Sequence, residues 1–203
     1  WATVLAGLLF IRRSSMTLAL AAFFAGIILF VANLNFMDPE ITPLVPVLKS
    51  YWLMIHVAVI TASYGFFGMS FLLGLLSLGF MASDKKSVLL NPHIRELRII
   101  NEISLNIGLY LLTAGIFLGA VWANESWGRY WGWDPKETWA LITMIVYAFV
   151  LHARFISYLR SDYAFSVMSV FALASVLMTY FGVNYYLSGL HSYGSGDTPP
   201  GLH

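Results

Sequence analysis

The sequence of 203 residues contains no cysteine, and this absence excludes several classes of function. Without thiols the chain cannot form disulfide bonds, hold an iron–sulfur cluster or bind zinc through thiolates. It also lacks the Cys-x-x-Cys-His signature that attaches haem covalently, so the chain is not itself a c-type cytochrome. Its chemistry must depend on other side chains.

Charged residues are scarce as well. They make up 10% of the chain, whereas a typical soluble domain has about 25%, and hydrophobic residues make up 59%. The net charge of +1 leaves no basic patch to neutralise phosphates, which excludes binding to nucleic acid. Apolar runs of about 20 residues recur, and this length spans a lipid bilayer as a helix. The composition therefore predicts an all-α, multi-span membrane protein.

The apolar runs predict a polytopic helix bundle with about six spans. The chain begins at Trp1 inside an apolar run, so we expect a fragment whose first span is truncated rather than a signal peptide. Residues 92–103 carry a helix start at Pro92 and a charged face formed by Arg95, Arg98 and Glu102, which predicts a short amphipathic surface helix. The six expected segments are residues 1–10, 16–34, 51–82, 104–123, 138–156 and 164 to about 189.

Lysine and arginine predict the orientation of these spans, because they collect in cytoplasmic loops. One set of loops carries eight of them: Arg12, Arg13, Lys85, Lys86, Arg95, Arg98, Arg154 and Arg160. The opposite set carries three: Lys49, Arg129 and Lys136. We therefore expect residues 122–139 and the C-terminal tail to lie on the extracytoplasmic side.

Five of the seven tryptophans lie within residues 122–139, here called the tryptophan-rich segment. An aromatic belt at the membrane interface explains one or two such residues per helix end, but not this density. Gly128 and Gly132 remove side chains beside the rings and permit close approach of the backbone. The segment therefore predicts a flat apolar surface for a large planar ligand. Its expected contact residues are Trp127, Tyr130, Trp131, Trp133 and Trp139.

Two histidines lie at the depth of this segment. His56 follows the start of its span by five residues, or about 8 Å, and His191 follows the last span. One such histidine is more often an interfacial residue with a satisfied hydrogen bond. Two at matching depth, beside aromatic rings, predict an axial pair for haem iron.

His152 lies 18 residues after Asp134, roughly 27 Å further along the helix. An ionisable residue at that depth is a candidate functional residue, here a ligand of a second haem. The opposite ligand would have to come from missing residues, another subunit or a group other than histidine. The alternative is a helix-end histidine near Arg154 that interacts with the helix C-terminus.

The run Asp134-Pro135-Lys136-Glu137 predicts a helix start. Asp at the N-cap, Pro at the first position and Glu at the third position form a capping box, so Asp134 and Glu137 are first of all caps. The same helix start favours anions. Arg129 and Lys136 lie nearby in sequence and are candidate partners for haem propionates.

With these residues in view, the chain resembles the haem-handling superfamily named for its tryptophan-rich WWD motif. Within it, the chain resembles the System II cytochrome c synthases of the CcsA type, or the matching half of the fused CcsBA protein. Residues 51–194 carry the resemblance, residues 1–50 hold the N-terminal spans and an outer loop, and residues 195–203 form the tail. Met144 departs from the family, where many relatives have Trp. The matching runs are WLMIHVAVITASYGFF, WGRYWGWDPKETWAL, YAFVLHAR and GVNYYLSGLHSYG.

The resemblance implies a cytochrome c haem lyase, or synthase, that handles haem b at two sites. It implies that His56 and His191 ligate an external haem, and that His152 ligates a haem within the membrane opposite a histidine of the partner CcsB. The acceptor would be the Cys-x-x-Cys-His motif of apocytochrome c, and no side chain would act as acid, base or nucleophile. The bacterial inner membrane and the thylakoid membrane fit equally well.

Three alternative functions remain open at this point. A System I haem handler would deliver haem to a chaperone. A cytochrome b-like electron-transfer subunit would usually pair histidines at both membrane depths within one chain. A transporter with an aromatic cap would bind no haem.

Overall fold

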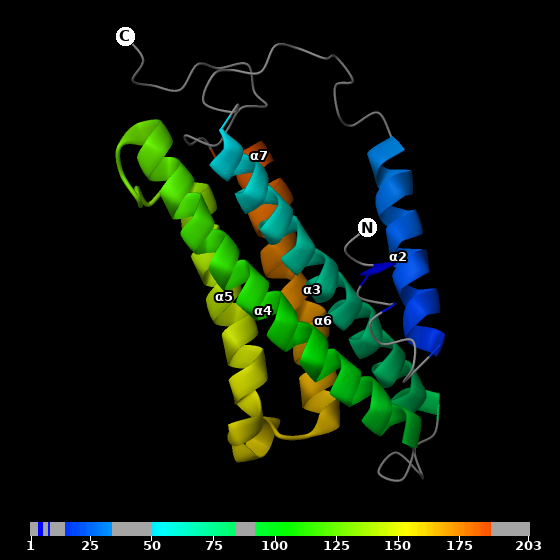
Figure 1. The fold of residues 1–203 in the computed structure, drawn as a ribbon. Coiled ribbons are helices and arrows are strands. Elements are labelled where there is room, and N and C mark those ends of the chain that lie inside the picture. The colour runs from blue at the N-terminus through cyan, green and yellow to red at the C-terminus, as the bar shows by residue number, and fades with distance from the viewer. Residues whose placement is uncertain (1–3, 6–7, 9–14, 34–49, 84–91, 188–203) are drawn as a thin grey trace.

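A computed structural model of the chain describes residues 4, 5, 8, 15–33, 50–83 and 92–187. Within these ranges the protein is an all-helical bundle without strands, which confirms the predicted fold class (Figure 1). The main helices are α2 (Ser15–Asn33), α3 (Tyr51–Ser83), α4 (Pro92–Trp127), α5 (Pro135–His152), α6 (Asp162–Leu177) and α7 (Val183–Tyr186). Short 3-10 turns at Ala153–Phe155 and Ser157–Leu159 follow α5, and a π-helical turn at Met178–Gly182 joins α6 to α7.

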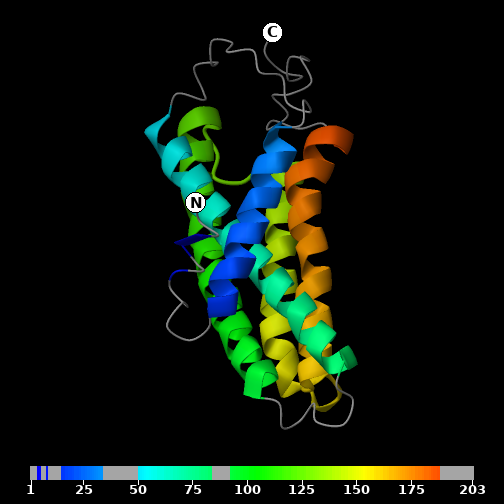
Figure 2. The ribbon, with the colours of Figure 1, turned by 90° about the vertical axis from the view of Figure 1, so that its right-hand side faces the viewer.

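Within the described ranges, four helices are long and apolar enough to cross a membrane, and the apolar helix Leu18–Phe30 is shorter. This agrees with a polytopic membrane protein of about six spans, although most of the expected first span lies outside the described residues. Figures 1 and 2 show α2 at the margin of the bundle, beside α3. Phe24 of α2 packs directly against Gly68 of α3.

The predicted surface helix over residues 92–103 is wrong as a separate element. These residues form the first turns of α4, which continues without a break to Trp127. The reason is long-range: the Arg98 Nε lies 3.5 Å from an Asp162 carboxylate oxygen on α6, and Glu102 pairs with Arg154 at 3.2 Å. Ion pairs between helices thus replace contact with a membrane surface. The apolar side chains of this stretch, Ile94, Leu97 and Ile100, are buried in the bundle.

Helix α4 approaches α3 closely because glycines of α4 lie on the side that faces α3. A Cβ atom built on Gly115 would lie 2.5 Å from the Cδ1 atom of Ile60, and one on Gly108 would lie 2.6 Å from the Cε1 atom of Phe67. Small residues at an interface allow membrane helices to pack with close backbones and strong van der Waals contact. The α3–α4 interface therefore depends on the absence of side chains at these positions.

The centre of the bundle is filled by large side chains. Phe67 of α3 and Tyr147 of α5 stack with ring centroids 3.6 Å apart and planes 3° from parallel. A buried polar chain lies nearby, in which Ser70 donates to Asn101 and the Asn101 amide donates to Ser169. The remaining buried members of the central cluster are Leu105, Leu112, Val150, Phe165, Ala172 and Val176.

The hydroxyl of Tyr147 is buried without a hydrogen-bond partner among the described residues. Because an unsatisfied buried hydroxyl destabilises the fold, Tyr147→Phe should raise the free energy of unfolding by about 1 kcal/mol. Phe67→Ala should lower it by about 3–5 kcal/mol, since the stacked ring is removed and a cavity is left. Thermal unfolding of the detergent-solubilised protein measures both changes. A loss of stability in Tyr147→Phe would show that the hydroxyl has a partner.

Candidate functional site

The tryptophan-rich segment is a helix end, a short connection and a helix start rather than one loop. Trp122 and Trp127 lie on the last turns of α4 and pack edge to face, with ring centroids 4.8 Å apart. Residues 128–134 form the connection, and α5 begins at Pro135. Trp139 lies within the first turns of α5. Trp122, Trp127 and Trp139 are therefore held by two helices, while Tyr130, Trp131 and Trp133 lie on the connection between them.

The predicted capping box at the start of α5 is confirmed. The Asp134 carboxylate accepts from the backbone N–H of Lys136 at 3.2 Å, and the Glu137 carboxylate accepts from the N–H of Asp134 at 3.2 Å. The same Glu137 oxygen also accepts from the N–H of Gly132 at 2.8 Å. Glu137 thus fixes the backbone on both sides of Trp133.

Trp133 adopts the left-handed backbone conformation, with a φ of 56°. This conformation is strained for a bulky residue and persists only where the surrounding structure imposes it. The two hydrogen bonds to Glu137 supply this constraint. As a result the Trp133 side chain points outward and is 70% exposed, although its ring also meets Trp131 edge to face at 5.7 Å.

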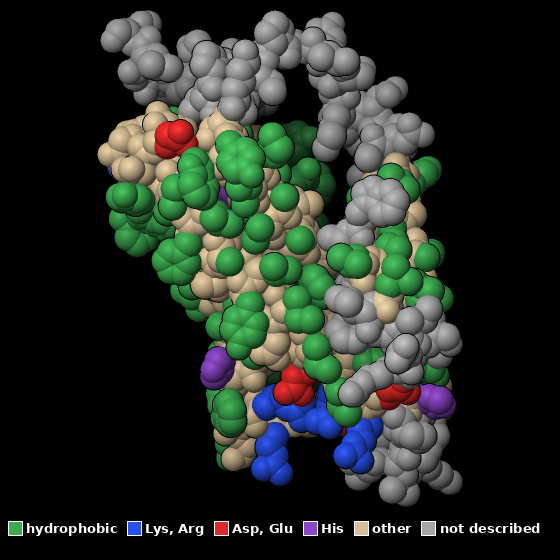
Figure 3. Space-filling model, in the orientation of Figure 1, with side chains coloured by type: hydrophobic (Ala, Val, Ile, Leu, Met, Phe, Trp, Pro, Cys, Tyr) green, Lys and Arg blue, Asp and Glu red, His purple; other side chains and the backbone are tan. Residues whose placement is uncertain are grey.

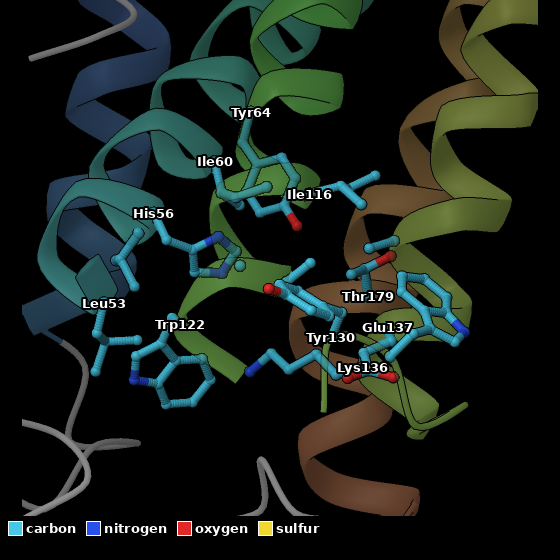
Figure 4. Close-up of a pocket in the computed structure, with 15 residues that line it drawn as sticks. Leu53, His56, Ile60, Tyr64, Ile116, Trp122, Tyr130, Lys136, Glu137 and Thr179 are labelled. Carbon is cyan, nitrogen blue, oxygen red and sulfur yellow. The ribbon is translucent and has the colours of Figure 1, made fainter. Parts of the chain in front are cut away.

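A cavity of about 260 Å³ lies between α3, α4, the 128–134 connection and the start of α5. Figure 4 shows His56 of α3 and Tyr130 of the connection pointing into the same space. Its walls are mostly apolar or aromatic, and Lys136 supplies a cation. The lining residues include His56, Gly119, Trp122, Tyr130, Trp131 and Lys136.

His56 is held by a hydrogen bond to the neighbouring helix. Its Nδ1 atom lies 2.7 Å from the carbonyl oxygen of Gly115 on α4. Because a carbonyl oxygen can only accept, Nδ1 must carry the proton, and a neutral ring then keeps its lone pair on Nε2. Metal-binding histidines are commonly oriented in this way, with one ring nitrogen bonded to a carbonyl and the other bound to the metal.

Helix α7 is tied to the wall of the cavity. The ammonium group of Lys136 donates to the side-chain oxygen of Asn184 at 3.1 Å. The hydroxyls of Thr143 and Thr179 lie 2.9 Å apart and join α5 to the π-helical turn that precedes α7. Turns of this kind occur frequently at functional sites. The end of the last described helix is therefore fixed at the same end of the bundle as His56.

The structure brings together only part of the predicted site. His56, Tyr130, Trp131, Lys136 and Glu137 line the cavity. The predicted contact residues that do not line the cavity are Trp127, Arg129, Trp133, Asp134 and Trp139. The guanidinium of Arg129 packs against Gly132 instead.

Sequence reasoning missed several lining residues of the cavity. Ile60 and Tyr64 follow His56 at intervals of four and therefore share its helical face, which is a signal that could have found them. Thr179 was also missed, and only the fold brings it to the cavity.

His152 lies at the other end of α5. It is the last residue of that helix, 17 residues after Pro135 and thus roughly 26 Å further along the axis. Its side chain is exposed, and its Nδ1 atom lies 2.7 Å from the carbonyl oxygen of Ala148. It therefore belongs to a different region from His56. His191 lies outside the described residues, so the axial pair with His56 stays a prediction.

Comparison with known proteins establishes the family. The family described as cytochrome C assembly protein matches residues 1–191. The chain belongs to this family. The resemblance to CcsA-type proteins is confirmed by relatives that carry this name.

Three relatives illustrate the similarity. Protein NrfI of Wolinella succinogenes is 54% identical over 201 residues, which cover 98% of this chain and 22% of NrfI. The cytochrome c biogenesis protein CcsA of Guillardia theta is 40% identical over 172 residues, covering 75% of this chain and 57% of that protein. CcsA of Prochlorococcus marinus is 36% identical over 232 residues, which cover 96% of this chain and 71% of that protein. The chain thus spans under a quarter of NrfI and just over half of the Guillardia protein.

The role of Glu137 in shaping the connection leads to a prediction. Glu137→Ala removes the acceptor for the N–H groups of Gly132 and Asp134, so it should lower the free energy of unfolding by about 1–2 kcal/mol. Hydrogen exchange at these two amides should accelerate, because the connection loses its constraint. Glu137→Gln is the matched control, since it keeps one side-chain oxygen as an acceptor and should show a smaller change. Equal effects of the two variants would contradict this role.

Proposed function

We propose that this protein binds haem in the cavity at His56 and presents it for covalent attachment to the Cys-x-x-Cys-His motif of apocytochrome c. The observation that carries the proposal is the hydrogen bond from His56 Nδ1 to the Gly115 carbonyl. It prepares Nε2 as an axial ligand on the wall of an apolar cavity. The family and its role in cytochrome c biogenesis agree with this chemistry.

The residues at the cavity suit a porphyrin in three respects. Imidazole is a common axial ligand of haem iron. Tyr130 and Trp131 offer aromatic surface to a planar ring system, while Trp122 is buried in the cavity wall. Lys136 places one ammonium group at the cavity, where it can pair with a propionate. Among the described residues no cluster of three His, Asp or Glu side chains forms a site for a bare metal ion.

The second axial ligand in this proposal is His191. The described chain ends at Leu187, next to α7, and α7 is joined to the cavity wall by the bond between Lys136 and Asn184. His191 follows Leu187 by four positions in the sequence, and an extended chain of this length spans at most about 14 Å. This reach is compatible with the proposed pairing of His191 with His56.

The chain contributes position and environment to the reaction. Haem supplies the two vinyl groups. Each acceptor thiol adds across one vinyl double bond, with sulfur joined to one carbon and hydrogen to the other, so no oxidant or reductant is consumed. The cavity residues hold the reacting groups in place and exclude water from the apolar walls. The histidine of the acceptor then replaces one axial histidine, which releases the product.

A second haem site in the proposal includes His152. Its exposed position at the end of α5 leaves its ring accessible to a partner, such as the histidine of a CcsB-type protein. An ionisable side chain facing outward from a membrane helix is expensive without such a partner. Haem would enter here and leave at His56.

The charge distribution supports a position for His152 on the cytoplasmic or stromal side of the membrane. Figure 3 shows Lys and Arg side chains gathered at the end of the bundle opposite the α4–α5 connection. The exposed Arg95 and Arg160 and the paired Arg98 and Arg154 belong to this end. Basic residues mark the cytoplasmic side of a bacterial inner membrane, and the stromal side of a thylakoid membrane by the same rule. The cavity then opens to the opposite side.

Visible spectra of the protein, purified with its membrane partner, test the ligands. His56→Ala and His191→Ala should each remove the same portion of the haem signal, because they ligate one iron. His152→Ala should affect a different portion. His93→Ala is the control, since His93 lies exposed at the start of α4 and stacks on Phe80. Spectra of the His56 and His191 variants that match the control would refute the assignment.

Attachment itself is tested by co-expression with an acceptor. An apocytochrome that carries Cys-x-x-Cys-His should gain haem that survives denaturation, and the amount should fall at least tenfold with His56→Ala. An acceptor with both cysteines changed to serine should gain none, because the thiols form the bonds. If the wild-type protein loads haem but attaches none, delivery to a chaperone is the better account.

A further inference from the structure

Beyond the axial histidine itself, one residue of α4 determines where the imidazole lies. A Cβ atom built on Gly119 would lie 2.6 Å from the Cε1 atom of His56, 2.8 Å from Nδ1 and 3.3 Å from Nε2. All three nearest atoms belong to the imidazole ring. Contacts this short do not occur for real Cβ atoms, so any side chain at residue 119 would displace the ring.

The other glycines of the same interface contact different side chains. Gly115 faces Ile60 and Gly108 faces Phe67, each at a comparable distance. The spacing of the three glycines along α4, seven and then four residues, matches the spacing of Phe67, Ile60 and His56 along the antiparallel α3. Among the described glycines, only Gly119 meets a histidine. Gly119 therefore leaves room for the His56 ring, whereas Gly108 and Gly115 leave room for apolar side chains.

Gly119 also opens the path to the hydrogen-bond acceptor. The Gly115 carbonyl that accepts from His56 lies one helical turn before Gly119, where a carbonyl ordinarily accepts from the N–H four residues later. The imidazole reaches this carbonyl at 2.7 Å because the turn above it carries no side chain. The surface of α4 at residues 115–119 is thus shaped to receive the ring edge.

We infer that Gly119 is a positioning residue for the haem ligand His56: it admits the imidazole to the Gly115 carbonyl and so fixes its tautomer and the direction of Nε2. The inference rests on the proposed function, because it concerns His56 as an axial ligand. A hydrogen bond from the second ring nitrogen raises the basicity of a metal-binding histidine, and its loss typically weakens metal affinity about 10–100-fold.

The first test is haem binding by Gly119→Ala. Haem is titrated into the protein with its membrane partner, and only the portion of the spectrum that His56→Ala removes is followed. Gly119→Ala should weaken this binding at least tenfold and raise the midpoint potential, because a less basic imidazole stabilises the oxidised iron less. Gly108→Ala is the matched control, since its added methyl meets Phe67 at the same 2.6 Å but eleven residues, roughly 16 Å, away along α4.

The second test is a double-mutant cycle on thermal stability, which needs no haem. Gly119→Ala should destabilise the wild-type protein but not His56→Ala, because removal of the ring leaves room for the methyl group. Gly108→Ala should lower the thermal stability of the wild-type protein and of His56→Ala by the same amount. If Gly119→Ala alone is not recovered folded but the double variant is, the clash with the ring is demonstrated. If neither is recovered although Gly108→Ala is, the inference is overturned.

The outcomes separate this inference from the proposed function. If His56→Ala leaves the haem spectrum unchanged, the proposed ligand fails and Gly119 loses its role with it. If His56→Ala removes the signal but Gly119→Ala binds haem like Gly108→Ala, only the positioning role is refuted.

Discussion

The close approach of α3 to α4 is the constraint on which the other features of this site depend. Gly108, Gly115 and Gly119 allow the two longest described helices to approach closely over residues 108–119 of α4. Membrane helices gain no hydrophobic energy from leaving lipid, so close van der Waals contact of this kind holds them together. Because the interface extends to the end of the bundle, it also sets the depth and direction of His56. Support of the fold and orientation of the ligand thus depend on the same surface.

A second set of contacts fixes the opposite wall of the cavity. The capping box begins α5, and the Glu137 carboxylate holds the connection from which Tyr130 and Trp131 project. Lys136 then ties the start of α5 to Asn184 near the end of the last described helix. The aromatic wall is therefore built from helix termini and their caps, which are more rigid than a free loop. A site that must hold a large planar molecule benefits from such preorganisation.

Local signals in the sequence predicted the parts of the structure that local interactions determine. The membrane helices follow from uninterrupted apolar runs, and the start of α5 follows from Asp134 and Glu137, three residues apart. The prediction of a separate surface helix was wrong because the ion-pair partners of Arg98 and Glu102 lie more than fifty residues away in the sequence, and no local pattern reveals them. Trp133 does not line the cavity, because its left-handed backbone turns its side chain outward, and no local pattern predicts this conformation. The match between Gly119 and His56 depends on the relative register of two helices, which the sequence does not display.

The filled centre of the bundle restricts the movement of a large molecule between its two ends. Phe67, Tyr147 and Val150 are almost fully buried between the cavity and the level of His152. A core packed in this way is as dense as an organic crystal and admits nothing the size of a porphyrin without unfolding. Among the described helices, large side chains therefore fill the centre of the bundle. A large planar molecule that moved between the two ends would therefore pass along the outer flank of the bundle rather than through its centre.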